Sequence, residues 1–312
     1  MVITTLVSLL GYALFFHKAL KLPSSVSPLF GISSLVFILY GASLIDQLAL
    51  TTSITWYLGV ILCPLSFLIK NDSESDYFPF AIFTVLFTLL YFGVRHLHFT
   101  SWDEFSFWGT VSKSVYESGA LPNQATPLGF KDYPLANTLF QYWIYKGMGQ
   151  YQEGYGYLAQ TILLFIPLLT ITQLKPRLKA ILGLCFFFLV LAIFDKRFLN
   201  SMYVDTVLAC TFAGCMISYV LLKHRYKALM LVPTIMLLPL IKQSGLLLAA
   251  VSAAGIVMAE WIQYHQPLKK QSNKWYLLML MLLFPGAIAF SHFSWAHHVK
   301  WLQPHNTFNT QA

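Results

Sequence analysis

The sequence predicts an all-α fold, a polytopic transmembrane helix bundle of about ten spans with one long extracytoplasmic loop that carries interfacial helices. The chain of 312 residues is 57% hydrophobic and only 10% charged, whereas soluble domains carry about 25% charged residues. Its apolar stretches are continuous and do not alternate, which disfavours a transmembrane barrel. Its basic residues gather in short loops between these stretches. We therefore expect residues 1–312 to form a single transmembrane domain.

Ten apolar segments follow one another along the chain, and several are shorter than the ~20 residues that a span prefers. Each is expected to be a helix, because lipid tolerates only a backbone whose hydrogen bonds are satisfied internally. The first has no early positive charge and ends without a small-residue cleavage site, so we expect a first span and not a removed signal. The segments are residues 2–16, 28–48, 55–69, 78–94, 154–174, 180–194, 206–222, 228–241, 245–263 and 275–291.

Lysine and arginine residues predict the orientation of these spans. Every second loop is basic, beginning with Lys18 and Lys21 and continuing with Lys70. The positive-inside rule places such loops in the cytoplasm, and it explains the net charge of +8 without nucleic acid as a partner. Residues 95–153 then form the long extracytoplasmic loop. The compact chain favours the bacterial inner membrane as its location.

Two adjacent acids, Asp103 and Glu104, stand at the start of this loop. The stretch from Ser101 to Glu104 matches a capping box, in which the serine caps a helix and the glutamate reaches back to it. Apolar residues at helical spacing follow as far as a stop at Gly119, which predicts an amphipathic helix on the outer leaflet. Two interpretations of the pair stay open and are compatible: helix capping, and a carboxylate at the water–lipid boundary that accepts a proton or holds a divalent cation.

Lys131 and Asp132 precede a second helix of the same loop. Pro134 suits the first turn of this helix, which we expect to end at Gly147. A lysine beside a helix start predicts an anion site. The alternative is a solvated charge pair in front of a helix.

Two further ionisable residues lie close to the predicted spans. Lys242 falls in a break between two apolar runs, and an ionisable group at membrane depth is a functional candidate because it is expensive to place there. A snorkelling lysine at the outer interface is the alternative. Asp205 comes directly before the seventh span. His96 and His98 offer a zinc site beside the acid pair, which we disfavour because the spacing is generic.

Taken in order, these motifs resemble those of the GT-C superfamily of membrane glycosyltransferases, in particular the protein mannosyltransferase and aminoarabinose-transferase branch. That family has an acid pair at the start of an outer loop, a Pro-Leu motif that opens another helix, an acid before a later span and a lysine that ends a further span. Here these are "SWDEFSFW", the Pro-Leu pair at 134–135, Asp205 in "RFLNSMYVDTVLA" and Lys242 in "LPLIKQSGLLLA". The resemblance covers about residues 95–255. In most of the family the acid pair follows the first span, whereas here it follows the fourth.

The resemblance implies an enzyme that moves a sugar from a polyprenyl-phosphate donor to an acceptor hydroxyl at the extracytoplasmic face. The acceptor is expected to be a lipid, a cell-envelope glycan or a protein, and membrane lipids are the expected surroundings. A transporter or flippase of a polar or lipid-linked substrate is the alternative. A transporter should show broken helices in both halves, and the sequence shows one such break, at 242–245.

The resemblance also implies roles for individual residues. Asp103 is the expected general base, and Glu104 supports it. Asp103 and Asp205 are the expected ligands of a divalent metal, Mg²⁺ or Mn²⁺, if the reaction uses one. The residues expected to bind the donor phosphate and the substrate are Lys131, Asp132, Tyr133 and Lys242.

Overall fold

The computed structural model describes residues 1–70, 76–126, 128, 132–173, 175–194, 197, 199–223, 227–265 and 274–302. Among these residues there are helices, turns and bends but no strand, so the predicted all-α fold class is confirmed. Each of the ten apolar segments predicted from the sequence contains a helix, although the second, 28–48, is interrupted by a turn after Ser43. In chain order the elements are α1 (Val2–Ala19), α2 (Ser27–Ser43), α3 (Leu48–Leu68), α4 (Phe78–Val94), the π-helix η1 (Glu104–Trp108), α5 (Gly109–Ser118), α6 (Ala136–Met148), α7 (Glu153–Phe165), the 3₁₀-helix η2 (Pro167–Gln173), α8 (Arg177–Phe194), α9 (Asp205–Leu221), the 3₁₀-helix η3 (Lys227–Leu231), α10 (Val232–Ile241), α11 (Gly245–His265) and α12 (Lys274–Leu302).

Several of these helices fit a membrane protein. In the described part of the chain, four helices, α1, α3, α11 and α12, are long and apolar enough to cross a membrane. A fifth candidate is the pair formed by α7 and η2, which bends by 41° at a short break. Shorter apolar helices make up most of the remaining predicted segments. Their large exposed hydrophobic side chains are what a lipid-facing surface requires.

The α3 helix begins at Leu48, seven residues before the start predicted from the sequence. Its first turns contain threonines and a serine, and these polar residues made the predicted apolar segment start later, at residue 55. In the structure the Thr55 hydroxyl donates to the Thr51 carbonyl oxygen at 2.8 Å, and the Ser53 hydroxyl donates to the Ala49 carbonyl oxygen at 3.2 Å. These hydroxyl groups are satisfied by the turn that precedes them, so they do not interrupt the helix.

Close packing of α1 against α3 depends on two glycines. A Cβ atom on Gly11 would collide with the carbonyl oxygen of Gly59, so the two backbones touch at this point. Small residues permit such an approach between apolar helices. The Tyr12 hydroxyl then donates to the Thr55 carbonyl oxygen at 2.6 Å. This hydrogen bond fixes α1 against α3.

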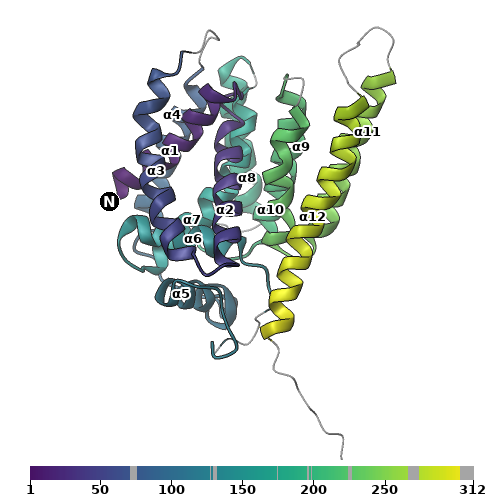
Figure 1. The fold of residues 1–312 in the computed structure, drawn as a ribbon. Helices are drawn as coiled ribbons and strands as arrows, with labels where there is room; N and C mark the ends of the chain where they lie inside the picture. Colours follow the sequence, from purple (N-terminus) through teal and green to yellow (C-terminus); the bar gives the residue numbers. More distant parts are fainter. Residues whose placement is uncertain are drawn as a thin grey trace, which may run out of the picture.

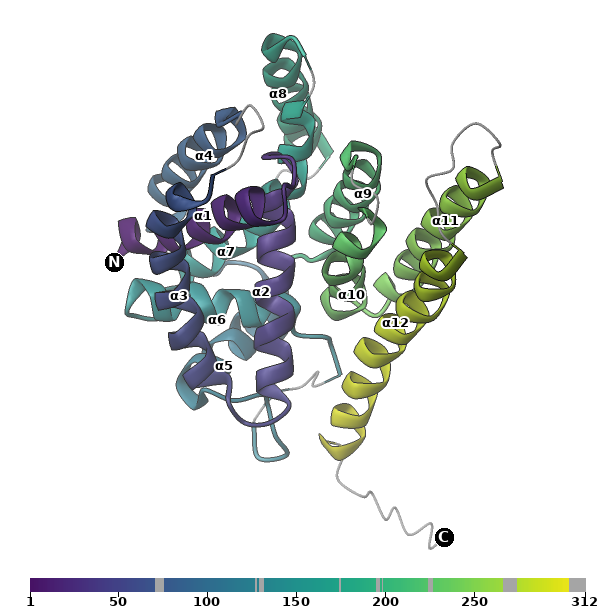
Figure 2. The same ribbon diagram turned by 45° about the horizontal axis from the view of Figure 1, so that its top comes forward.

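The short helices α6 and α7 lie above α5 and between α3 and α10 in the lower part of the bundle (Figure 1), and Figure 2 shows them again between these helices. Nearly all of their residues are buried, including the polar Asn137, Gln141 and Gln160. Buried amides need partners, and the Asn137 amide donates to the Gln160 side-chain oxygen at 2.8 Å. Part of the predicted extracytoplasmic loop, residues 95–153, is therefore packed into the core of the bundle.

Basic residues lie beside the start of α4, at the upper end of the bundle. Figure 1 shows α5 and the last turns of α12 at its lower end, and the start of α4 and the end of α11 at its upper end. At the upper end, Arg177 pairs with Asp76 at 3.2 Å and the Lys18 ammonium lies 5.4 Å from the centre of the Tyr77 ring. The acids at the start of α5 lie at the lower end.

Candidate functional site

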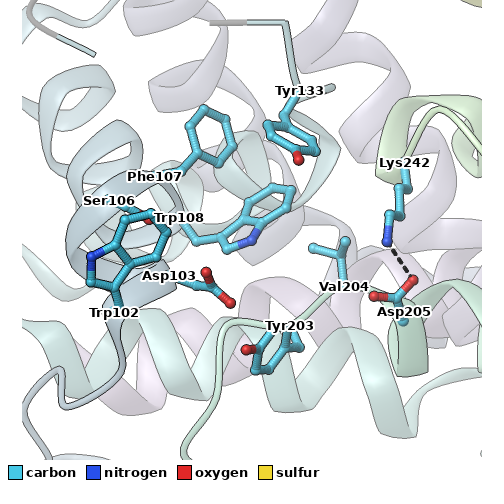
Figure 3. Close-up of a pocket in the computed structure, with 10 residues that line it drawn as sticks. All are labelled: Trp102, Asp103, Ser106, Phe107, Trp108, Tyr133, Tyr203, Val204, Asp205 and Lys242. Carbon is cyan, nitrogen blue, oxygen red and sulfur yellow. Dashed lines mark hydrogen bonds and ion pairs between the residues drawn. The ribbon is translucent and has the colours of Figure 1, made fainter. Parts of the chain in front are cut away.

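A pocket of about 180 Å³ lies at the lower end of the bundle, and four separate stretches of the chain line it (Figure 3). It brings together four residues that the sequence analysis selected, namely Asp103, Tyr133, Asp205 and Lys242. Figure 3 shows Lys242 and Asp205 on the side of the pocket opposite Trp102. The complete lining consists of Trp102, Asp103, Ser106, Phe107, Trp108, Tyr133, Tyr203, Val204, Asp205 and Lys242.

Asp103 enters the pocket at the start of the helix that the sequence predicts to lie on the outer leaflet. This helix opens with a π-helical turn, Glu104–Trp108, and continues as α5 to Ser118. It ends as predicted at Gly119, whose φ of +68° is left-handed and suits glycine. The wide π-turn places both Phe107 and Trp108 on the pocket lining, and π-turns inside helices occur frequently at functional sites.

Glu104 points away from the pocket and is only 1% exposed. Its carboxylate accepts hydrogen bonds from the backbone N–H groups of Thr100 and Ser101, both at 2.8 Å. The glutamate half of the predicted capping box is therefore confirmed. The serine half is wrong, because the Glu104 N–H donates to the Ser101 carbonyl oxygen at 3.1 Å, while the Ser101 hydroxyl accepts a hydrogen bond from Arg197 at 3.2 Å. The adjacent acids thus divide their roles, one facing the pocket and one holding the turn.

Tyr133 reaches the pocket from the turn before α6. Its ring centre lies 5.0 Å from that of Phe107 and 5.5 Å from that of Trp108. The Asp132 side chain is exposed and does not line the pocket. Lys131, the predicted anion ligand beside them, lies outside the described residues.

The end that we predicted for this second loop helix is wrong. The α6 helix continues through Gly147 and stops at Gly149, which has a φ of +81°. Gly147 is required for packing instead, because a Cβ atom there would come within 2.8 Å of the Thr5 hydroxyl.

Asp205 and Lys242 form an ion pair at the edge of the pocket. Asp205 lies in the first turn of α9, where a negative charge complements the helix dipole. Lys242 follows the last residue of α10 in an extended conformation, with φ −155° and ψ 151°. The Lys242 ammonium donates to the Asp205 carboxylate at 2.6 Å, and the two side chains are 31% and 63% exposed. The break predicted at 242–245 is confirmed, since α11 begins at Gly245.

Tyr203 is a pocket residue that the sequence analysis missed. The Asp103 carboxylate raises the pKa of the Tyr203 phenol, first through a side-chain hydrogen bond and then through its charge. Tyr203, Val204 and Asp205 are consecutive and all line the pocket, where the chain enters α9. The position of Tyr203 close to Asp205 was therefore the available signal.

Buried amides fix the backbone that carries Tyr203. The Gln160 amide donates to the Tyr203 carbonyl oxygen at 2.6 Å and accepts from Asn137 at 2.8 Å. The nearby Gln141 amide contacts the Met202 sulfur at 3.3 Å. The central helices α6 and α7 thus hold the segment before α9 in place.

The two pocket carboxylates do not form a metal centre as they stand. No group of three or more His, Cys, Asp or Glu side chains suited to a metal occurs among the described residues. One oxygen of Asp205 is already taken by Lys242. The predicted metal role of Asp103 and Asp205 therefore stays a prediction.

Comparison with protein-family models, curated proteins and solved structures finds no significant match. The pocket and the motifs that line it are therefore the basis for any functional proposal.

Proposed function

We propose that this protein is a membrane glycosyltransferase that moves a sugar from a polyprenyl-phosphate donor to an acceptor hydroxyl. The observation that carries the proposal is the convergence of Asp103, Tyr133, Asp205 and Lys242 in one pocket. These residues come from the four motifs that resemble the GT-C superfamily, and they are separated by long stretches of sequence. A shared pocket is what a common active site requires.

The chemistry of the lining suits a sugar. Trp102, Trp108, Tyr133 and Tyr203 provide aromatic faces for the C–H groups of a pyranose ring, and the carboxylates accept hydrogen bonds from its hydroxyl groups. The volume of about 180 Å³ suits one small ring rather than a long oligosaccharide. The exposed indole of Trp102 is of the kind found at membrane–water interfaces, where the head group of a lipid-linked donor lies.

In the proposed reaction, the acceptor oxygen forms a bond to the anomeric carbon while the bond from that carbon to the phosphate oxygen breaks. Asp103 takes the proton of the acceptor hydroxyl, and polyprenyl phosphate leaves with the electron pair of the broken bond. Lys242 has three N–H donors, so it can keep Asp205 as a partner while it stabilises the departing phosphate. Glu104 acts only through the backbone of the turn that carries Asp103.

A divalent metal is not required by this sequence of events. Mg²⁺ is often held by one or two carboxylates together with substrate phosphates, and Asp103 is the pocket carboxylate that is not ion-paired with Lys242. The Asp205–Lys242 ion pair would compete with a metal for the Asp205 carboxylate.

We further propose that the chain crosses the bacterial inner membrane about ten times, with the pocket on the extracytoplasmic side. The positive-inside rule supports this orientation, because Lys18 and Arg177 lie beside the start of α4, at the end of the bundle opposite α5 (Figure 1). A donor phosphate at that face lies at the lipid boundary, beside the interfacial helix. Lipid, glycan and protein hydroxyl groups are all chemically competent acceptors.

A transporter or flippase is a second candidate because two elements of the bundle are broken. The chain bends by 41° between α7 and η2, and it breaks again between α10 and α11. Discontinuous helices are typical of transporters. A transporter would move its substrate without altering any covalent glycan structure.

The test compares envelope glycans by mass spectrometry in the wild type, a deletion strain and an Asp103→Asn strain. We expect the deletion and Asp103→Asn to lose the same sugar unit while the variant protein still accumulates. Loss in the deletion alone would move the site away from Asp103. Unchanged glycans in both strains would favour transport.

A further inference from the structure

The backbone carbonyl of Asp132 accepts two hydrogen bonds from side chains that are distant in sequence. The Trp295 indole N–H donates to it at 2.9 Å, and the Gln243 amide donates at 3.3 Å. Asp132 directly precedes Tyr133, and Gln243 directly follows Lys242. One oxygen atom therefore connects the neighbours of two pocket residues to the last helix of the bundle.

The two donors differ in how much they contribute. Trp295 is only 6% exposed, so its N–H has little access to bulk water and depends mainly on this carbonyl as its partner. Gln243 is exposed, and water can replace its longer hydrogen bond. The buried indole is therefore the dominant constraint on the position of the Asp132 carbonyl.

The same end of α12 holds the other part of the loop between α5 and α6. A ring nitrogen of His298 lies 3.1 Å from the Pro122 carbonyl oxygen, and the Gln124 amide donates to the Trp301 carbonyl oxygen at 2.7 Å. Trp295, His298 and Trp301 occur at helical spacing, so they form one face of the helix. This face contacts the loop at several points.

We propose that Trp295 is a positioning residue for the pocket: by holding the Asp132 carbonyl, it sets Tyr133 against Lys242. The inference rests on the proposed function for its consequence in transfer, although the contact itself can be tested without it. It assigns a role to α12, which contributes no side chain to the pocket lining.

Hydrogen exchange measured by mass spectrometry on the full-length protein in detergent tests the contact. Trp295→Phe keeps the ring and removes the N–H donor. We expect about fivefold to tenfold faster exchange in the peptides that contain Tyr133 and Lys242, the effect of losing one hydrogen bond. Trp301→Phe is the matched control, because it changes another indole of the same helix whose loop contact uses only its backbone carbonyl. Gln243→Met should give the same local pattern with a smaller change.

The amount of the transferred sugar in envelope glycans supplies the second readout. We expect Trp295→Phe to lower it and Trp301→Phe to leave it unchanged. Unaltered exchange in Trp295→Phe, or equal acceleration across all peptides, would overturn the inference. Faster local exchange with an unchanged glycan would also overturn the positioning role. If deletion of the protein changes no glycan, the proposed function fails, and the exchange pattern alone decides whether Trp295 positions the pocket.

Discussion

Lys242 donates to Asp205 at 2.6 Å although 37 positions separate the two residues in the chain. One lies in the break between α10 and α11 and the other in the first turn of α9. Each is located where a helix ends or begins, so neither charge is enclosed within a helical span. The pair sets the cationic group of the pocket at a fixed place while leaving its remaining N–H donors available for a ligand.

Replacing Lys242 should separate function from stability. We expect Lys242→Met to lower sugar transfer by about 100-fold, because it removes the cation that stabilises the leaving phosphate. Protein stability should change little, since exposed ion pairs contribute at most about 1 kcal/mol. Glycan mass spectrometry and thermal unfolding in detergent measure the two effects. Lys113→Met, which breaks the exposed Lys113–Glu117 pair, is the control; equal transfer in both variants would remove Lys242 from the site.

Asp103 and Glu104 should respond differently to loss of charge, although they are neighbours. Asp103→Asn is expected to reduce transfer by about 10²- to 10⁴-fold, the usual contribution of a general base, and to leave the protein folded. Glu104→Gln weakens two charge-assisted hydrogen bonds to backbone N–H groups and should cost about 1–3 kcal/mol of unfolding free energy. Unfolding midpoints and glycan amounts for both variants test this division. A destabilised Asp103→Asn with normal transfer would reverse the assignment.

The contact between Tyr203 and Asp103 predicts a pH effect with a definite sign. The carboxylate raises the pKa of the Tyr203 phenol above 10.0, so the folded protein holds this proton more tightly than the unfolded chain. Any contribution to stability is therefore full below pH 10 and is lost as the pH rises through the raised pKa. Tyrosinate absorbance, taken as the difference between the wild type and Tyr203→Phe, reports this titration. In an Asp103→Asn background the same difference should shift to lower pH, and an unmoved curve would contradict the contact.

The helical bundle was predictable because long apolar segments are a strong sequence signal for helices in a membrane. The boundaries of the helices were harder to predict. The start of α3 was missed because threonines suggest a loop in a sequence. In the structure their hydroxyl groups donate to carbonyl oxygens of the same helix. The α12 helix extends to Leu302, past the segment predicted to end at residue 291. Trp295 in this extension is buried, whereas Phe293 and Trp301 are exposed, so hydropathy alone does not reveal which of these residues contact protein.

The pocket was predictable where a residue stands next to a break in the apolar pattern. Asp103, Asp205 and Lys242 each mark such a point, and all three line the pocket. The direction of each side chain was harder to predict. Glu104 points into the protein and accepts hydrogen bonds from backbone N–H groups, because adjacent residues on a helix point to different sides. Trp295 was invisible to sequence reasoning, since its role depends on a tertiary contact with the Asp132 carbonyl.

A buried polar cluster far from the pocket should stabilise the opposite end of the bundle. Glu260 of α11 is 3% exposed, accepts a hydrogen bond from the Tyr219 hydroxyl at 2.9 Å and lies 3.8 Å from the Lys227 ammonium. Glu260→Leu leaves that lysine without its carboxylate and should cost about 3 kcal/mol of unfolding free energy. In a protein that carries Cys63→Ala and Cys185→Ala, a thiol-reactive dye reports exposure of the buried Cys210 and Cys215 and so measures unfolding.

Glu117→Gln is the control for this substitution, because Glu117 pairs only with an exposed lysine at 4.0 Å. Its unfolding temperature should match that of the wild type. We expect Glu260→Gln to fall between Glu260→Leu and the control, since the amide oxygen still accepts from Tyr219. Equal unfolding temperatures for Glu260→Leu and Glu117→Gln would show that the cluster contributes no net stability.

The proposed orientation can be tested with two exposed lysines at opposite ends of the bundle, Lys113 on α5 and Lys179 on α8. In a version without the four native cysteines, Lys113→Cys should react with an impermeant maleimide in intact cells. Lys179→Cys should react only after permeabilisation, because the positive-inside rule places its basic connection in the cytoplasm. The reverse pattern would put the acid pair in the cytoplasm and away from an extracytoplasmic donor. Since the pocket geometry would be unchanged, such a result would exclude the proposed substrate side without excluding transfer chemistry.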